Sequence, residues 1–417
     1  SATGNTTAQV SEMLKGKNGT EITIKIERWN EKKPIVKKFI RENIQFNPVT
    51  YYAVLGNGVG YLMLNDFTDK AALEFKNAVN DMMKTGQIKS LIVDVRNNPG
   101  GLVDEAVKIM GYFVPKGTSI VSTKGRNFET DRTYKTPSDP VFPEMKLAVM
   151  VNRGSASASE ILAGALQDLD RGIVIGERTF GKGLVQSIRP VGYGGNIKVT
   201  MAKYYTPSGR CVQALDYSHR NEDGSVGRIP DSLTTAFKTA NGRIVRDGGG
   251  VLPDSVTTDS RKLNIAYYIL MQNHYFDYAT RYAQKHKSIA SPDKFSLTDA
   301  EFNDFVNYLV NEKKFTYTTQ TENYFKQLAE VAEFEGFDQT AKAEFDALKA
   351  RLMPDVEKNI RDNRKEIEEM LTVEIIQRYY FQKGQVQYML KDDTDLKVAT
   401  DFLKNNSRYN QVLKKQG

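Results

Sequence analysis

Ser157 and Glu160 have the types and spacing of a reactive serine at the start of a helix. Ser157 lies in "NRGSASASEILAGALQDL", where an alanine on each side permits a tight turn that exposes the side chain close to backbone N–H groups. Glu160 follows three residues later, which matches a capping box and predicts Ser157 at the positive end of a helix, where developing negative charge is stabilised. The same spacing suits a serine that only caps the helix, and Ser155 and Ser159 are candidates of the same kind.

A serine nucleophile needs a base, and Lys182 is the leading candidate. Histidine is the usual base, but the three histidines lie in a polar loop or in the helical C-terminal region: His219, His274 and His286. Lys182 lies in "TFGKGLVQ", whose glycines let the backbone bring the amine close to a serine. Three apolar neighbours are predicted to desolvate the amine and to favour its neutral form: Phe180, Leu184 and Val185. The alternative is a solvated loop lysine without a chemical role.

The stretch "GERTFGKG" (residues 176–183) also resembles a nucleotide-binding P-loop with one change. Gly183 replaces the Ser or Thr whose hydroxyl ligates Mg²⁺. Asp94, at the end of "LIVDV", could hold Mg²⁺, but a P-loop must open a helix, and "GLVQSIRPVGYGG" contains a proline and further glycines. The pattern favours a strand and a turn here, and therefore no nucleotide.

A glycine pair that follows another strand supplies candidate donors for an oxyanion. In "DVRNNPGGLVDEA", Gly100 and Gly101 come after an apolar strand and before a helix, where glycines can present bare backbone N–H groups. An oxyanion hole made from Gly100 or Gly101 together with Ala158 is geometrically reasonable. The alternative is an ordinary turn from strand to helix.

These candidates lie in a segment with an α/β pattern, residues 48–257. Its apolar strands are "SLIVDV", "KLAVMV" and "GIVIG", and helical periods occupy 69–84 and 159–169. Strands that are apolar throughout are expected to be buried on both faces of a sheet that is at least partly parallel. The predicted fold class is therefore α/β, of the mixed α+β kind, with a mostly parallel sheet.

Two further regions flank this core. Residues 1–47 hold a helical pattern at 8–15 and two strand patterns, "EITIKIER" and "IVKKFI", which is too little for a good core. Residues 258–417 contain long amphipathic stretches, one of which begins with the capping box of Thr298 and Glu301. This last region is predicted to be an all-helical domain.

Composition excludes several classes of protein. The net charge is +7, but Lys and Arg alternate with Asp and Glu instead of forming basic blocks, which argues against a nucleic-acid partner. No apolar run approaches the length of a membrane span. The single cysteine, Cys211, excludes an internal disulfide and a cysteine-based zinc site. We expect neither metal nor cofactor.

Three motifs in order resemble those of the carboxyl-terminal processing peptidases, also called tail-specific proteases. The motifs are "LIVDVRNNPGGL", "NRGSASASEILAGAL" and "IGERTFGKGLVQ", and the similarity covers about residues 48–256. The resemblance implies a serine endopeptidase with a Ser-Lys dyad and an acyl-enzyme. It implies Ser157 as nucleophile, Lys182 as general base and Gln186 as the residue that orients the lysine, and it favours position 157 over its neighbouring serines.

The resemblance also implies a neighbouring domain, binding partners and a cellular location. A PDZ domain precedes the family's core and captures substrate tails, and residues 1–47 look like the C-terminal half of one, so we expect a truncated chain. The implied partners are polypeptides with flexible C-terminal tails, with a homo-oligomer or an adaptor through the helical domain as further options. The implied location is the periplasm or cell envelope of a bacterium. The alternative is a catalytically silent peptide-binding or scaffold protein of the same fold.

Overall fold

The computed structural model describes the chain in eight segments and divides it into two compact units. The described residues are 1–28, 31–44, 46–55, 58–126, 131–257, 264–337, 339–352 and 355–414. Unit 1 is Ser1–Asn47 and unit 2 is Pro48–Gly417. Among the described helices, none combines the length and the apolarity that a bilayer crossing requires.

Unit 1 consists of one helix and one hairpin. Its elements are α1 (Thr7–Leu14), which begins with a capping box of Thr6 and Gln9, and the antiparallel pair β1 (Glu21–Ile26) and β2 (Ile35–Ile40). None of the described residues of this unit is buried. The helix and both strands are confirmed, and so is the expectation that this piece is too small to form its own core.

The main sheet of unit 2 has six strands in the order β16-β9-β8-β5-β4-β3. The strands are β3 (Val49–Val54), β4 (Val59–Leu64), β5 (Ser90–Asp94), β8 (Lys146–Val151), β9 (Ile173–Gly176) and β16 (Ser255–Val256). All neighbours run parallel except β3 and β4, which are antiparallel. Every residue of β5 and β9 is buried. The predicted mostly parallel sheet with strands covered on both faces is confirmed.

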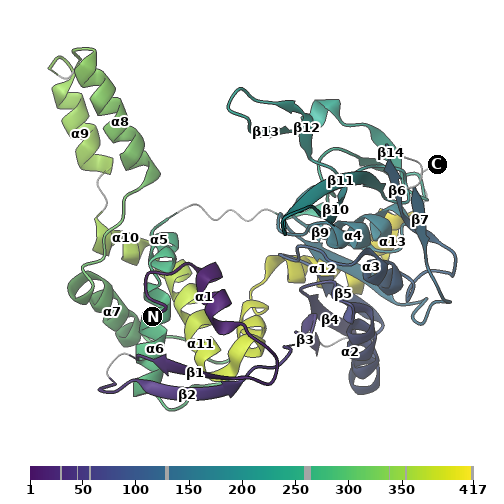
Figure 1. Ribbon diagram of the computed structural model, residues 1–417, viewed down its shortest axis with the longest axis horizontal. Coiled ribbons are helices and arrows are strands. Elements are labelled where there is room, and N and C mark those ends of the chain that lie inside the picture. Colours follow the sequence, from purple (N-terminus) through teal and green to yellow (C-terminus); the bar gives the residue numbers. More distant parts are fainter. Residues whose placement is uncertain are drawn as a thin grey trace. The chain divides into compact units, whose positions relative to one another are not determined.

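Helices α2, α3 and α4 cover one face of this sheet (Figure 1). Their bounds are α2 (Ala71–Gly86), α3 (Val103–Met110) and α4 (Ala158–Asp168), so the two predicted helical periods are confirmed with shifts of one or two residues. The predicted apolar stripe of α2 is buried in the core: Ala72, Phe75, Val79 and Met82. These helices begin just after sheet strands, which places their N-terminal turns at the edge where strands end.

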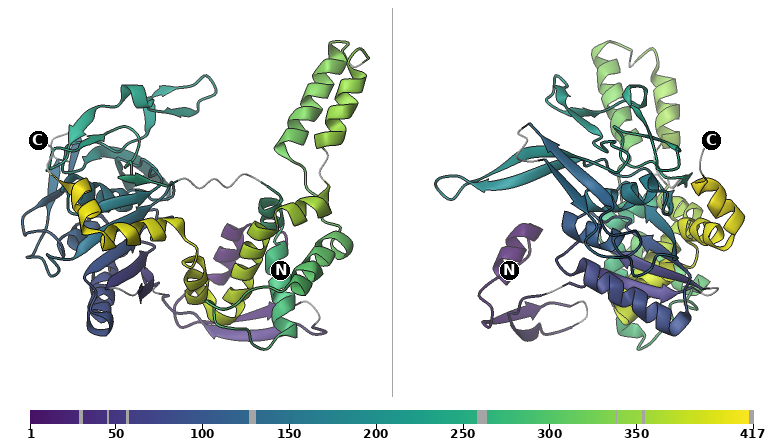
Figure 2. Two further views of the ribbon diagram at one scale, coloured as in Figure 1. Left: turned by 180° about the vertical axis from the view of Figure 1, so that it is seen from behind. Right: turned by 90° about the vertical axis from the view of Figure 1, so that its right-hand side faces the viewer.

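The opposite face of the sheet is covered by the last two helices of the chain, seen in yellow from behind in Figure 2. They are α12 (Thr394–Lys404) and α13 (Asn406–Leu413). Arg96, two residues after the end of β5, pairs with Asp94 (2.7 Å), with Asp393 (2.6 Å) at the N-cap of α12, and with Asp395 (3.0 Å). The C-terminal end of the predicted helical region therefore completes the core that carries the candidate site.

A second sheet, two short hairpins and one 3-10 helix extend from the core. The sheet has the order β10-β11-β6-β7, made of β6 (Ser119–Gly125), β7 (Arg132–Lys135), β10 (Leu184–Pro190) and β11 (Asn196–Tyr205). The other elements are β12 (Leu215–Arg220), β13 (Val226–Arg228), η2 (Asp231–Leu233), β14 (Ala236–Lys238) and β15 (Ile244–Arg246). The residues after Lys182 therefore open a strand, which confirms the argument against a P-loop.

The regular elements among the described residues between 264 and 389 are all helices, as predicted. The elements are α5 (Ile265–Met271), α6 (His274–Lys285), α7 (Asp299–Asn307), η3 (Tyr308–Glu312), α8 (Gln320–Phe334), α9 (Lys342–Leu352), α10 (Val356–Asp362) and α11 (Arg364–Met389), with non-helical backbone at Phe381. The capping box of Thr298 and Glu301 begins α7. A core rich in tyrosine and phenylalanine holds α5, α6, α7 and α11 together.

Candidate active site

The three motifs found in the sequence meet at one end of the main sheet. The glycine turn (residues 95–101) touches the serine turn (residues 152–157) through a hydrogen bond from the Ala156 N–H to the Asn98 carbonyl, 3.0 Å. The serine turn in turn accepts the Phe180 N–H at the Ser155 carbonyl, also 3.0 Å. Backbone hydrogen bonds thus join the serine turn to the glycine turn and to the loop that contains Lys182, which are far apart in the sequence.

Ser157 occupies the N-cap of α4 with an unusual backbone. Its φ is +57° and its ψ is −114°, a conformation that costs a non-glycine residue about 1–3 kcal/mol and that recurs at functional sites. The side chain is half-buried. The hydroxyls of Ser155 and Ser159 are instead fully buried and donate to the carbonyls of Val95 (2.7 Å) and Asn98 (3.0 Å). Those two serines therefore hold the turn, and Ser157 is the one that a substrate could reach.

Gly100 lies directly against Ser157. A Cβ added at Gly100 would stand 2.7 Å from the Ser157 Cβ and 2.8 Å from the Ala158 backbone nitrogen, and its φ is +104°, so only glycine fits. The buried Asn98 side chain fixes this turn, because it donates to the Leu64 carbonyl (2.7 Å) and accepts the Gly100 N–H (2.9 Å). Gly100 and Ser157 are so close that a side chain at position 100 would not fit between them.

The backbone donors near Ser157 can now be told apart. The N–H of Gly100 is engaged by Asn98. Within the described part of the chain, the N–H groups of Gly101 and Ala158 have no hydrogen-bond acceptor, and Ala158 is the first residue of α4, whose N–H groups have no partner inside the helix. The free N–H of Ala158 lies beside Ser157 at the helix N-terminus, and that of Gly101 follows the Gly100 backbone that contacts Ser157. Such N–H groups can stabilise a negative oxygen.

Glu160 connects the serine to the lysine loop. Its fully buried carboxylate accepts the Ser157 N–H (3.0 Å), which realises the predicted capping box, and also the N–H groups of Gly181 (2.7 Å) and Lys182 (2.8 Å). The Thr179 hydroxyl donates to it as well (2.6 Å). Burial raises the pKa of Glu160, and the four hydrogen bonds oppose that shift.

Lys182 is fixed through its backbone while its side chain stays exposed. The buried Tyr204 donates its hydroxyl to the Lys182 carbonyl and also reaches the Ser157 carbonyl at 3.3 Å. The prediction that apolar neighbours bury the lysine is wrong, because Phe180 is itself 42% exposed and Leu184 only half-buried. Within the described residues, no hydrogen bond joins the Lys182 amine to Ser157. Gln186 is exposed on β10.

Sequence reasoning missed two residues of this arrangement. Glu160 had the spacing of a helix cap, but nothing in the sequence indicated its bonds to Gly181 and Lys182. Tyr204 lies in "YYTPSGRCVQ", which resembles the strand and loop that follow the lysine in the family, but the resemblance gave Tyr204 no role. Only the fold brings its hydroxyl to both carbonyls. Among the described residues, no group of three or more His, Cys, Asp or Glu side chains is arranged to hold a metal ion.

Two parts of the chain are similar to known proteins. Residues 58–217 match peptidase family S41, and residues 265–403 match the C-terminal helical domain of a probable PDZ-protease. The carboxy-terminal-processing protease of Bartonella bacilliformis is 40% identical over 215 residues, 51% of this chain and 49% of that protein. A probable CtpA-like serine protease of Staphylococcus epidermidis is 41% identical over 213 residues, 51% of this chain and 42% of that protein.

Solved structures give a partial match of the same kind. The photosystem II D1 C-terminal processing protease is 31% identical, with 49% of this chain and 56% of that chain covered and a TM-score of 0.37. The chain spans about half the length of the curated relatives it matches.

Proposed function

We propose that the chain, whose residues 58–217 match peptidase family S41, is a serine endopeptidase of the carboxyl-terminal processing kind with a Ser157–Lys182 dyad. The observation that carries the proposal is the strained, half-buried Ser157 at the N-terminus of α4, with the Gly100 backbone pressed against it. If Ser157 only capped the helix, neither its positive φ nor the glycine at position 100, which leaves space beside the hydroxyl, would be explained.

In the proposed reaction, the neutral Lys182 amine takes the Ser157 proton while Ser157 Oγ attacks the carbonyl carbon of a peptide bond. The tetrahedral intermediate collapses, the C–N bond breaks, and Lys182 gives its proton to the departing amine. A water molecule then attacks the acyl-enzyme ester with Lys182 again as base, and the acid product leaves as the Ser157 hydroxyl is restored. These steps need no cofactor.

The oxyanion formed in both steps would accept hydrogen bonds from Ala158 and from the glycine turn. Of the two glycines, Gly101 is the better donor, because the Gly100 N–H is already bonded to Asn98. Gly100 then acts by its lack of a side chain. Both donors are fixed before substrate arrives, and preorganised donors need no reorganisation during the reaction.

The lysine must turn from solvent toward Ser157 for this chemistry. Its backbone is held by Glu160 and Tyr204, so rotation of the flexible side chain is sufficient. A bound polypeptide would cover the amine and exclude water, which favours the neutral amine that a base requires. Gln186, four residues along β10, is proposed to orient the amine in that state.

The proposed substrates are polypeptides with flexible C-terminal tails. Support comes from the relative named a carboxy-terminal-processing protease, and we further propose that unit 1 is the second half of a PDZ domain. An exported location in a bacterium, and assembly or adaptor binding through the helical region, are further proposals that rest on the family resemblance.

A second candidate function is a silent peptide-binding protein of the same fold. The exposed Lys182 side chain and the lack of a Ser157–Lys182 bond within the described residues favour it. It predicts peptide binding without any product.

The test is cleavage of casein, an unfolded protein, by the 417-residue chain, with products identified by mass spectrometry. We expect cleavage, and we expect Ser157→Ala and Lys182→Ala each to lower kcat by about 10⁴-fold or more with unchanged Tm. Lys198→Ala, an exposed lysine on the neighbouring strand β11, is the matched control and should keep full activity. Full activity of either dyad variant, or bound peptide without products, would reject the dyad.

A further inference from the structure

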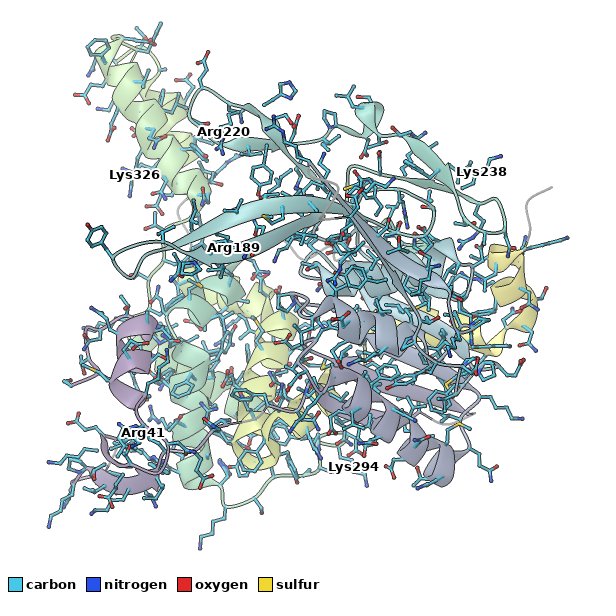
Figure 3. The ribbon with its side chains drawn as sticks, turned by 45° about the vertical axis from the view of Figure 1, so that its right-hand side comes forward. Arg41, Arg189, Arg220, Lys238, Lys294 and Lys326 are labelled. Atoms are coloured by element: carbon cyan, nitrogen blue, oxygen red, sulfur yellow. The ribbon has the colours of Figure 1, made fainter. Side chains whose placement is uncertain are left out.

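A pocket of about 480 Å³ lies beside the proposed active site, and of its lining residues only Gln186 has a role in the mechanism above. It lies where the hairpin β10–β11 faces β12. In Figure 3, Arg189 marks the far end of β10 and Arg220 marks the far end of β12. The side chains that matter for its chemistry are Leu184, Cys211, Leu215, Ile229 and Leu233. Its volume is within the range of pockets that bind small ligands.

The wall of this pocket is bonded directly to the lysine turn (Gly181–Gly183). The Gly183 N–H donates to the Gln213 side-chain oxygen (2.8 Å), and the Ala214 N–H donates to the Gly181 carbonyl (2.9 Å). A Cβ at Gly183 would stand 2.7 Å from the Gln213 backbone nitrogen, so the turn and the wall have no space between them. The pocket is therefore held in a constant position relative to Lys182.

The pocket is also near enough to receive part of a substrate. Leu184 lies two residues after Lys182, so their Cα atoms are within about 8 Å of each other. An extended polypeptide advances about 3.3–3.6 Å per residue. A side chain about one to three residues away from a peptide bond held at Ser157 and Lys182 is thus at the right distance.

The chemistry of the lining favours an apolar side chain. Leu184, Leu215 and Ile229 are half-buried, and Leu233 is 73% exposed at the rim, so apolar surface remains uncovered. The acidic groups of the pocket already have donors. Asp216 accepts the Ser218 N–H (3.0 Å) and contacts His219 (2.7 Å), and Asp247 accepts the Thr235 N–H (2.6 Å).

We propose that this pocket is a specificity subsite that binds a large apolar side chain of the polypeptide substrate close to the scissile bond. The inference rests on the proposed function, because it assigns the occupant as part of the cleaved chain. It adds a substrate preference that neither the dyad nor the oxyanion donors determine. The residues that set the preference are Leu184, Leu215 and Ile229, and the partner is the leucine- or phenylalanine-sized side chain that covers them.

Cys211 makes binding in this pocket directly measurable. It lines the pocket and is the only cysteine of the chain, so alkylation reports on one position. Burial raises the pKa of its thiol, and the reaction with iodoacetamide is therefore run at pH about 9 to obtain enough thiolate. The Ser157→Ala variant of the full chain prevents turnover, so this measurement does not depend on cleavage.

The probes are two soluble twelve-residue peptides that differ only at central positions, leucine and phenylalanine in one, serine and glycine in the other. We expect the apolar peptide at saturation to slow Cys211 alkylation at least about 5-fold and the polar peptide to leave the rate within about 1.5-fold, measured by mass spectrometry. An unchanged rate with the apolar peptide, or equal protection by both peptides, overturns the proposal.

A second measurement fills the pocket in the active chain. Ile229→Trp is compared with Ile244→Trp, whose side chain is 61% exposed on β15 and lies outside the pocket. Ile229→Trp should lower kcat/KM about 10-fold or more for a peptide with leucine near the cleavage site and about 2-fold or less for its alanine counterpart. Ile244→Trp should leave both values unchanged.

The two proposals fail in different ways. Equal losses on both peptides in Ile229→Trp, with normal Tm, overturn the subsite and leave the peptidase in place. Absence of cleavage by the parent chain overturns the peptidase, whereas protection of Cys211 in the Ser157→Ala variant would still establish an apolar peptide site. Absence of protection there overturns the subsite independently.

Discussion

The serine turn and the lysine turn carry the two halves of one proposed dyad, and the fold treats them differently. The serine turn is enclosed: Ser155 and Ser159 are fully buried, and the glycine turn is bonded to it. The lysine turn is held from one side only. Its backbone is bonded to the buried Glu160, while Lys182 and Gln186 are exposed and Gln186 lines the neighbouring pocket.

This difference separates two requirements of the chemistry. A nucleophile and its oxyanion donors must be preorganised, which demands buried and fully bonded backbone. A lysine base must be neutral when it acts, and water around an exposed amine opposes that state. We infer that the serine side is complete in the free protein and that the lysine side is completed by a substrate lying along β10.

The largest expected effect is a break in the serine side by Gly100→Ala. The new Cβ would meet backbone atoms of Ala156 and Ala158 as well as Ser157, and the φ of +104° adds strain, so we expect a loss of about 3 kcal/mol or more in unfolding free energy. Activity should fall below detection. Gly117→Ala is the control, because its φ is +81° with open space around it. Equal Tm losses in both variants would show that the close approach to Ser157 does not matter.

The next effect tests the link between the two sides. The Glu160 carboxylate accepts four hydrogen bonds, two at each oxygen. In Glu160→Gln, an NH₂ group replaces one of these oxygens, so two of the four donors face another donor. We expect a loss of about 2–3 kcal/mol in unfolding free energy and at least about 100-fold in kcat.

Glu177→Gln is the matched control for Glu160→Gln. Within the described residues, Glu177 forms an ion pair only with the exposed Arg153, at 3.4 Å. Its replacement should change stability by about 0.5 kcal/mol or less. Chemical denaturation and steady-state kinetics give both readouts. A fully active Glu160→Gln variant would mean that the serine and lysine turns are positioned independently.

A smaller effect distinguishes neighbouring serines. Ser159→Ala leaves the buried Asn98 carbonyl with one hydrogen bond fewer and should cost about 1–2 kcal/mol, with activity within about 10-fold of the parent chain. Ser157→Ala should show the opposite pattern, with unchanged stability and no activity. Paired thermal melts and casein assays measure the contrast. If Ser159→Ala were inactive at full stability, the assignment of the nucleophile would be wrong.

The smallest effect concerns Gln186. Because its side chain is exposed, Gln186→Ala should leave Tm unchanged. If it orients the lysine in the substrate complex, kcat should fall about 10-fold and KM should change little. Arg189→Ala, three residues along the same strand and also exposed, is the control. A change in KM alone would assign Gln186 to substrate contact and remove it from the dyad.

Much of the fold followed from periodicity. The apolar strands, the helix after Ser157 and the helical C-terminal region were all predicted. A strand that is buried throughout gives an apolar run in the sequence, and a helix with one buried face gives apolar residues at helical spacing. Of the second sheet, only the strand after Lys182, β10, was predicted, and its pairing with the other strands was not. The longest strands of this sheet, β10 and β11, expose many residues, and such strands carry a weak alternation. Likewise, nothing in the sequence indicated that α12 and α13 cover the main sheet.

The sequence by itself determined the identities in the site: a serine between alanines at a helix start, a lysine between glycines and a glycine pair after a buried strand. Tertiary structure decided their relations. Only the fold showed that Gly100 rather than Gly101 touches Ser157, that Glu160 bonds both turns, and that Lys182 is exposed. The physical reason is that local spacing records backbone conformation, whereas burial and contacts across the fold depend on residues far apart in the chain.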